Sequence, residues 1–272
     1  MHRSRRLAIR EWAALVVLSV LSGPAGCAWS PAAGIESGDM VTQERQRLKD
    51  SPVTLSRPIV ILSGYRTMGS NAWGLYRGLA PLLGAKRDDF LILAYPLRSN
   101  IDGIAEYVVE RVNERWPSDN PEKTVEVDVI GISMGGLVAR TAALPPDPAS
   151  GDRRLAIKRL YTLGTPHRGA RMAEVIAPDS AARAMKSGSD LLARLDEALG
   201  DREYELVCYA RLNDMLVGAQ NSSPEGMDPI WTNGFFLTSH YLITRDRLIV
   251  TDLALRIRGE TPIGKPGTPP SQ

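Results

Sequence analysis

The sequence predicts an α/β fold, in which a mostly parallel, twisted sheet carries helices on both faces. Short apolar runs rich in β-branched residues alternate along the chain with longer segments of helical periodicity. The runs at residues 59–62 and 90–95 are hydrophobic throughout, which is typical of parallel strands buried on both faces. The composition, with 43% hydrophobic and 24% charged residues, is that of an ordinary globular protein.

The elements follow one another in the order that such a sheet requires. Strands are expected at residues 57–62, 90–95, 124–130, 157–163 and 205–210. Helices are expected at residues 71–83, about 100–116, 134–143 and about 245–258. Between the last two strands, short helices at 171–175, 181–185 and 191–199 predict a short helical cap at about 166–204. Ligands of open parallel sheets bind at the carboxyl ends of the strands, so chemistry is expected there.

Length, charge and cysteine content exclude several classes of protein. The 272 residues include 33 Lys and Arg against 31 Asp and Glu, a formal charge of +2. This balance argues against a disordered chain and against a strongly basic nucleic-acid binder. Two cysteines are too few for a disulfide scaffold or a four-thiolate zinc site.

The first 26 residues have the layout of a bacterial export signal. Four arginines precede a short uncharged stretch at residues 12–21, which is too short to span a membrane as a helix. The following Ala25-Gly26-Cys27 resembles a lipobox, in which the cysteine becomes lipidated, although Pro24 stands where an aliphatic residue is usual. Without residues 1–26, 29 basic and 30 acidic residues remain, so the slight basicity belongs to the signal.

The segments that flank the expected domain have loop-like composition. Residues 27–56 mix Gly, Ser, Pro and charged residues without a clear period, and we interpret them as a tether, in which 43–49 could form a short helix. Residues 261–272 contain four prolines and are expected to form a disordered tail. The sequence therefore predicts a single domain at residues 57–260.

The strongest chemical signal is the Gly-Ile-Ser-Met-Gly-Gly string at residues 131–136. It follows an expected strand and begins an expected helix, which is the context of a nucleophile elbow centred on Ser133. The flanking glycines let neighbouring backbone pass, and the turn raises the hydroxyl above the sheet at a helix N-terminus. A tight Gly-Ser turn without chemistry is the alternative.

A serine hydroxyl needs a base, and histidine is the side chain with a suitable pKa. His2 lies in the expected signal, His167 follows the fourth strand and His240 precedes the last helix. The usual chain order of nucleophile, acid and base favours His240, because it leaves room for an acid after the fifth strand. His167 is interpreted as a structural residue or as one that lines the cleft.

The acid that would orient His240 is expected to be Asp214. It comes directly after the strand at 205–210, so it lies at the carboxyl edge. Asp228 is the competitor, although Gly226 and Pro229 around it are typical of a plain turn. Backbone N–H groups must stabilise the oxyanion, and Tyr65 after the first strand and Met134 after the nucleophile are the candidates.

These residues together resemble the α/β-hydrolase superfamily, and within it a serine lipase and esterase group. The resemblance extends over about residues 57–258. Its parts are Ser63-Gly64-Tyr65, the elbow at 131–136, the string Leu-Gly-Thr-Pro-His-Arg-Gly at 163–169, and Asp214 with His240. The third part is typical of bacterial triacylglycerol lipases and of deacylases that act on lipid-linked glycans. Many members have His-Gly where this chain has Ser63-Gly64, which leaves the support of that loop open.

The resemblance implies a serine hydrolase that cleaves carboxylic esters through an acyl-enzyme on Ser133. Asp214 and His240 are its implied partners, without a cofactor or a metal. An acyltransferase with the same triad and a non-catalytic binding protein on this scaffold remain alternatives. The expected partners are an ester or lipid substrate and, through a lipid anchor on Cys27, a membrane surface, but no nucleic acid. The protein is expected to be exported from a bacterial cell, to face the periplasm or the outside, and to contain Cys208 as a buried thiol.

Overall fold

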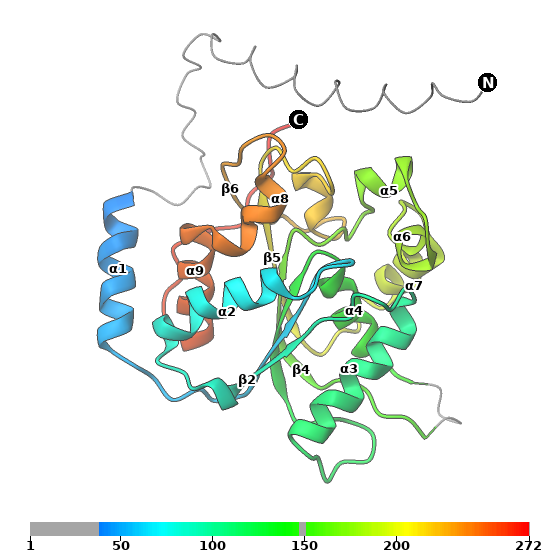
Figure 1. Cartoon of the computed structure of the whole chain (residues 1–272), viewed down its shortest axis with the longest axis horizontal. Helices are drawn as coiled ribbons and strands as arrows, with labels where there is room; N and C mark the ends of the chain where they lie inside the picture. The colour runs from blue at the N-terminus through cyan, green and yellow to red at the C-terminus, as the bar shows by residue number, and fades with distance from the viewer. Residues whose placement is uncertain (1–37, 147–150, 272) are drawn as a thin grey trace, which may run out of the picture. The chain divides into compact units, whose positions relative to one another are not determined.

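The computed structural model describes residues 38–146 and 151–271 (Figure 1). The expected export signal and the candidate lipidation site Cys27 lie outside these residues. Within the described residues, no helix is both long and apolar enough to cross a membrane.

The centre of the domain is a sheet of six parallel strands in the order β2-β1-β3-β4-β5-β6. The strands are β1 (Ile59–Leu62), β2 (Phe90–Leu93), β3 (Val127–Ile132), β4 (Ile157–Leu163), β5 (Glu205–Arg211) and β6 (Ile230–Thr232). Because β1 pairs with both β2 and β3, the strand order reverses there, and a crevice opens at the carboxyl ends of β1 and β3.

The helices cover both faces of this sheet, which confirms the predicted fold class (Figure 1). They are α1 (Gly38–Asp50), α2 (Ser70–Leu83), α3 (Ile101–Arg115), α4 (Met134–Ala142), α5 (Arg171–Val175), α6 (Ser180–Ala184), α7 (Asp190–Glu197), α8 (Ser239–Leu242) and α9 (Arg247–Arg258). Single 3-10 turns are η1 (Arg87–Asp89), η2 (Ala219–Ser222) and η3 (Ile243–Arg245).

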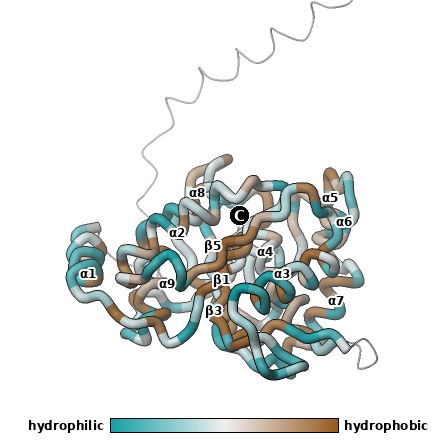
Figure 2. The backbone as a smooth tube through the Cα atoms, turned by 60° about the horizontal axis from the view of Figure 1, so that its bottom comes forward, coloured by the Kyte–Doolittle hydropathy of each residue, from teal (hydrophilic) through white to brown (hydrophobic). Residues whose placement is uncertain are grey.

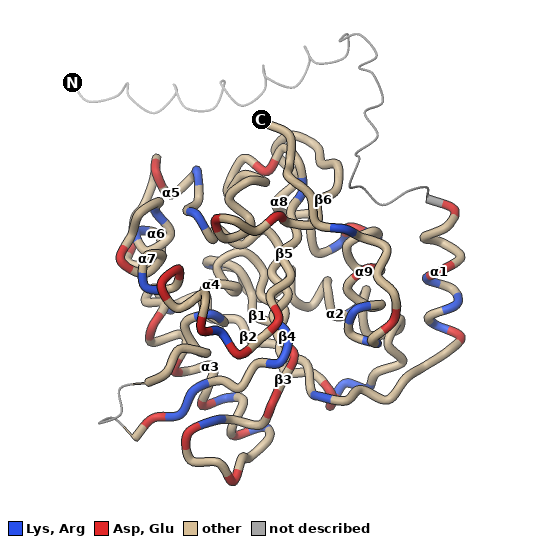
Figure 3. Tube along the Cα trace, turned by 180° about the vertical axis from the view of Figure 1, so that it is seen from behind, with Lys and Arg blue, Asp and Glu red and all other residues tan. Residues whose placement is uncertain are grey.

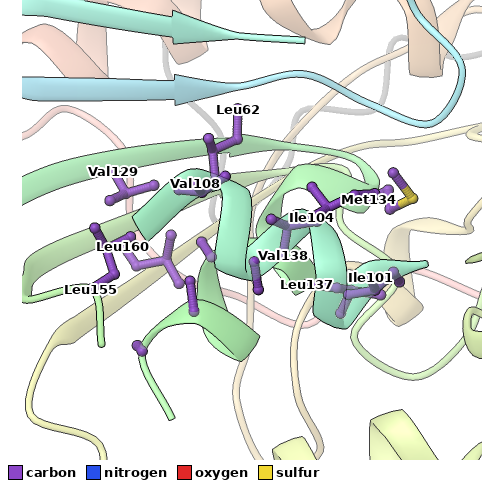
Figure 4. Packing of buried hydrophobic residues seen from close by; sticks show 14 of the residues in the cluster. Leu62, Ile101, Ile104, Val108, Val129, Met134, Leu137, Val138, Leu155 and Leu160 are labelled. Atoms are coloured by element: carbon purple, nitrogen blue, oxygen red, sulfur yellow. The ribbon is translucent and has the colours of Figure 1, made fainter. Parts of the chain in front are cut away.

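Alternate strand residues supply two hydrophobic cores, one on each face. Val60 belongs to the core beside α3 and α4, as do Leu62 and Val129, which Figure 4 shows. Ile59 and Ile61 belong to the core beside α2 and α9. This two-residue alternation is the expected geometry of a strand that is buried on both faces. The central strands are accordingly the most hydrophobic part of the tube in Figure 2.

Helix α1 corrects the expectation that residues 27–56 form only a tether. Val41 and Leu48 of this helix are buried, and Leu48 belongs to the same core as α2 and α9. Arg258 of α9 donates hydrogen bonds to the carbonyl groups of Leu48 and Ser51. Both acidic and basic residues lie along α1 (Figure 3). Residues 38–50 are therefore part of the folded domain.

The C-terminal segment also differs from the expected disordered tail. The Gly264 amide donates to buried Asp252 at 2.6 Å, and the Gly267 amide donates to the Pro229 carbonyl at 3.1 Å. Ile263 packs against the core beside α9. Residues 261–271 therefore lie on the domain.

Candidate active site

Ser133 lies at the turn from β3 to α4 in a backbone conformation that side chains rarely adopt. Its φ is 53° and its ψ is −124°. A β-carbon on Gly131 would lie 2.4 Å from the Gly136 α-carbon, and one on Gly135 would lie 2.5 Å from the Leu62 carbonyl oxygen. Only glycine fits at these positions, so the surrounding backbone holds the serine in its strained turn. The predicted elbow is therefore present as a structural feature.

His240 contacts Ser133 from α8, although the two residues are 107 positions apart in the sequence. Its Nε2 atom lies 3.0 Å from the Ser133 hydroxyl oxygen, and its Nδ1 atom lies 2.7 Å from Asp214 Oδ2. A carboxylate only accepts hydrogen bonds, so Nδ1 carries the proton and Nε2 is left to accept the serine proton. Ser239 holds this segment by donating to the Leu212 carbonyl at 2.5 Å.

Asp214 follows β5 and is 1% exposed. Its Oδ1 atom accepts the backbone N–H groups of Leu216 at 2.9 Å and Val217 at 3.0 Å. Burial raises the pKa of this carboxyl group, but the hydrogen bonds from His240, Val217 and Leu216 outweigh it, so the pKa lies below its ordinary value. Asp214 is thus held ionised and oriented. The competing Asp228 is exposed and accepts from Thr268 instead.

Residues 163–169 contact both the elbow and the histidine–aspartate pair. The Thr165 hydroxyl donates to the Ser133 carbonyl at 2.8 Å, which fixes the elbow. Gly164 has a φ of 59°, and a β-carbon there would lie 3.4 Å from His240 Nδ1 and 3.5 Å from Asp214 Oδ2. The glycine therefore leaves room for the histidine–aspartate pair.

His167 in the same string lies apart from this pair and is fully buried. Its Nδ1 atom lies 3.0 Å from an Arg140 guanidinium nitrogen, and its Nε2 atom lies 3.1 Å from the Thr162 hydroxyl. Because a guanidinium only donates, Nδ1 must accept and the proton resides on Nε2. Burial and the charges of Arg140 and Arg168 hold the pKa of His167 well below its usual range. His167 therefore has the surroundings of a neutral structural residue.

Cys208 of β5 is a free, buried thiol beside His167. Burial raises the pKa of this thiol to about 11, so it stays protonated. Over residues 38–146 and 151–271, no cluster of three or more His, Cys, Asp or Glu side chains could hold a metal ion.

The loop after β1 brings Tyr65 to the serine. A β-carbon on Gly64 would lie 3.2 Å from the Ser133 β-carbon, so this loop and the elbow are in close contact. Tyr65 follows Gly64 and Met134 follows Ser133, so the backbone amides of both residues lie beside this contact. The carbonyl oxygen of a substrate bound to Ser133 would lie at the same place. Their donation to an oxyanion stays a prediction.

Two residues that sequence reasoning missed hold this loop. The Tyr95 hydroxyl group donates a hydrogen bond of 2.6 Å to the Ser63 carbonyl oxygen. Asp179, the N-cap of α6, accepts from the Tyr65 hydroxyl at 2.7 Å and from Arg66 at 2.8 Å. The loop is therefore fastened both to the sheet and to the cap. These contacts join residues 32 and more than 100 positions apart, and no local pattern indicates them.

A cavity of about 600 Å³ opens above Ser133 and His240. The helices of the predicted cap form one wall, chiefly through small and aliphatic side chains. These are Ala170, Met172, Ala173, Ile176, Ala182 and Met185. Leu216 and Val217 continue this apolar wall. The opposite wall comes from the loop after β1, from α2 and from η3. The site thus joins a serine that is hydrogen-bonded to a histidine to a largely apolar cavity.

The parallel sheet, the strained serine between β3 and α4, and the acid and histidine after later strands define the α/β-hydrolase fold. Solved structures with this fold resemble the chain, although no family model and no curated protein sequence matches it.

The lipase BlEst2 of Bacillus licheniformis is one such structure. Its mature form has a TM-score of 0.53 at 13% identity, over 76% of this chain and 94% of that one. Its propeptide form has a TM-score of 0.54 at 12% identity, over 80% and 54% of the two chains. At these identities the likeness establishes the fold alone.

Phospholipase PlaB from Legionella pneumophila is a more distant match. Its TM-score is 0.48 at 14% identity, over 62% of this chain and 46% of that one. The chain therefore spans about half the length of PlaB.

Proposed function

We propose that this protein is a serine hydrolase that cleaves carboxylic esters through an acyl-enzyme on Ser133. The observation that carries the proposal is the continuous hydrogen-bonded chain from Ser133 through His240 to Asp214, with contacts of 3.0 and 2.7 Å. A serine in a strained elbow with a base and an orienting carboxylate in line is the arrangement of nucleophilic acyl transfer.

In the proposed reaction, His240 accepts the Ser133 proton while the serine oxygen attacks the ester carbonyl carbon. Asp214 stabilises the imidazolium that forms, because its carboxylate is held beside Nδ1. The amides of Tyr65 and Met134 stabilise the oxyanion. When the carbon–oxygen bond breaks, His240 gives its proton to the leaving alcohol. The same histidine then activates water, which releases the acid and restores the serine.

The apolar lining on the cap side of the cavity is suited to bind an acyl chain. The apolar wall contributed by α5 and α6 extends from Pro166 and Ala170 to Met185, beside Ser133. Burial of a hydrocarbon chain against such a wall contributes about 0.8 kcal/mol for each methylene group. The lipase BlEst2, with the same fold, is consistent with an ester or lipid substrate.

Hydrolysis of 4-nitrophenyl butyrate by the wild type and by Ser133→Ala tests the proposal. We expect the variant to lose about 10⁴-fold or more in kcat, as removal of a nucleophile does in serine hydrolases. Ser118→Ala, outside the cavity, is the matched control and should keep the wild-type rate. An Ser133→Ala variant as active as the wild type would overturn the assignment.

A further inference from the structure

The cavity lining is apolar along the cap and mixed along α2, α8 and η3, where Tyr241 and Leu242 lie among polar side chains. We call the polar side chains of this second side the polar wall. Its members are Thr67, Ser70, Asn71, Thr244 and Arg245. Thr67 and Asn71 lie side by side, with their side-chain oxygens 3.3 Å apart. A substrate that contacts both the cap and the polar wall is expected to be apolar at one end and polar at the other.

Arg245 is the one residue of the cavity lining with a permanent charge. Within the described part of the chain it has no ion pair and no side-chain hydrogen bond. The neighbouring carboxylate of Asp246 is already engaged, since its Oδ2 atom lies 3.0 Å from Arg211 and accepts from Thr232 at 2.8 Å. Arg245 is exposed, so its charge is open both to solvent and to a group that enters the cavity.

Arg245 lies close in the chain to the residue that protonates the leaving alcohol in the proposed reaction. His240 gives its proton to the alcohol in the proposed reaction, and α8 and η3 lead directly from His240 to Arg245. The Arg245 guanidinium lies over Gly74 of α2, where its Nε atom is 3.8 Å from the position of a β-carbon. In this arrangement the acyl chain packs against the cap, and the alcohol part of the substrate contacts the polar wall.

We propose that Arg245 binds an oxyanion on the alcohol part of the substrate, so that the preferred esters are those of anionic alcohols such as phosphate-bearing ones. The guanidinium presents paired N–H donors that match a phosphate or carboxylate. The hydroxyl group of Ser70 on the same wall supplies a further donor. This inference rests on the proposed ester hydrolysis and specifies its substrate class.

A matched pair of soluble substrates tests the subsite. The pair is 1-butyrylglycerol 3-phosphate and neutral 1-butyrylglycerol, and the readout is the ratio of their kcat/KM values. We expect the wild type to prefer the phosphate ester and Arg245→Ala to lower the ratio about tenfold, since a partly exposed charge-assisted pair is lost. Arg245→Lys should keep part of the preference, and Arg245→Glu should reverse it.

Vesicles distinguish a lipid source of the oxyanion from a soluble one. Phosphatidylglycerol or neutral diacylglycerol is diluted into vesicles of one anionic ether lipid, so that both surfaces carry similar charge. A fall in the ratio for Arg245→Ala in either the soluble or the vesicle pair supports the subsite and identifies its source. An unchanged ratio in both pairs overturns it.

The matched control is Arg247→Ala. Arg247 lies two residues away but outside the cavity lining, and it donates to Thr42 of α1. Its substitution should leave the ratio at the wild-type value, and an equal fall for both variants would contradict a specific role of Arg245. A wild type that cleaves neither ester and is not labelled at Ser133 would instead refute the proposed hydrolase activity.

Discussion

Substitution of Asp214 by asparagine separates the orienting role of this residue from its bulk. Asp214 Oδ1 accepts two backbone N–H groups, from Leu216 and Val217, and only an oxygen can do so. In Asp214→Asn the amide oxygen must therefore keep that place, and the amide NH₂ group must face His240 Nδ1. Because this group donates, Nδ1 has to accept, and the histidine proton moves to Nε2.

The expected loss follows from this change of tautomer. A protonated Nε2 faces the Ser133 hydroxyl at 3.0 Å and is unable to accept its proton. Loss of the correct tautomer in a serine–histidine–acid triad lowers kcat about 10⁴-fold, which corresponds to about 5 kcal/mol in the activation free energy. The hydrogen bonds to the two backbone amides survive, so the variant should still fold.

Steady-state hydrolysis of 4-nitrophenyl butyrate measures the effect, with the circular dichroism spectrum as a check of folding. The matched control is Asp228→Asn, because Asp228 is the competing aspartate after β5 and, among the described residues, its side chain accepts hydrogen bonds from Thr268 alone. A folded Asp214→Asn variant within tenfold of the wild-type kcat would refute the role of the acid.

Two further predictions concern stability. Gly135→Ala should lower the free energy of unfolding by about 1–3 kcal/mol in urea denaturation, because the new β-carbon would lie 2.5 Å from the Leu62 carbonyl oxygen. The control is Gly103→Ala in α3, where nothing lies within 4 Å of the new β-carbon, and this substitution should stabilise the protein by up to about 1 kcal/mol. Equal effects of the two substitutions would contradict the steric argument. His167 stays neutral in the fold while the unfolded chain binds a proton near pH 6.5, so the free energy of unfolding should fall as the pH drops below 6.5, by at most about 1.4 kcal/mol per pH unit from this residue. His167→Gln should flatten this dependence between pH 6.5 and 5, and an unchanged slope would show that His167 titrates alike in both states.

The elements that the sequence predicts correctly are those with local signals. The strand before Ser63 is an unbroken apolar run, the strand before Gly131 is rich in valine and isoleucine, and the glycines of the elbow lie within five residues of Ser133. β6 was not predicted, because Ile230–Thr232 is only three residues long and has no pattern that separates it from a loop.

The ends of the domain show what local composition leaves out. Helix α1 is polar on most of its surface, and only Val41 and Leu48, seven residues apart, indicate the face that packs on α9. The proline-rich C-terminal segment is held by the Gly264 amide on Asp252. These contacts depend on where distant parts of the chain meet, so composition alone suggests a tether and a disordered tail.

The candidate site divides in the same way. Ser133, Asp214 and His240 could be selected by motif and chain order, and the structure brings them together. Asp179 and Arg245 could not, because their proximity to the site arises from folding of the cap and of η3 over the sheet. Residue types common on protein surfaces become informative only when their partners are known.

Covalent labelling with a fluorophosphonate tests directly whether Ser133 is the nucleophile, because the probe reacts with a serine whose proton a neighbouring base can accept. The native protein is treated with the probe, digested, and mapped by mass spectrometry, with urea-unfolded protein as the control. We predict a single adduct, on the peptide that contains Ser133, in the native sample only. Absence of an adduct on native protein, or an adduct on a different serine, would contradict it.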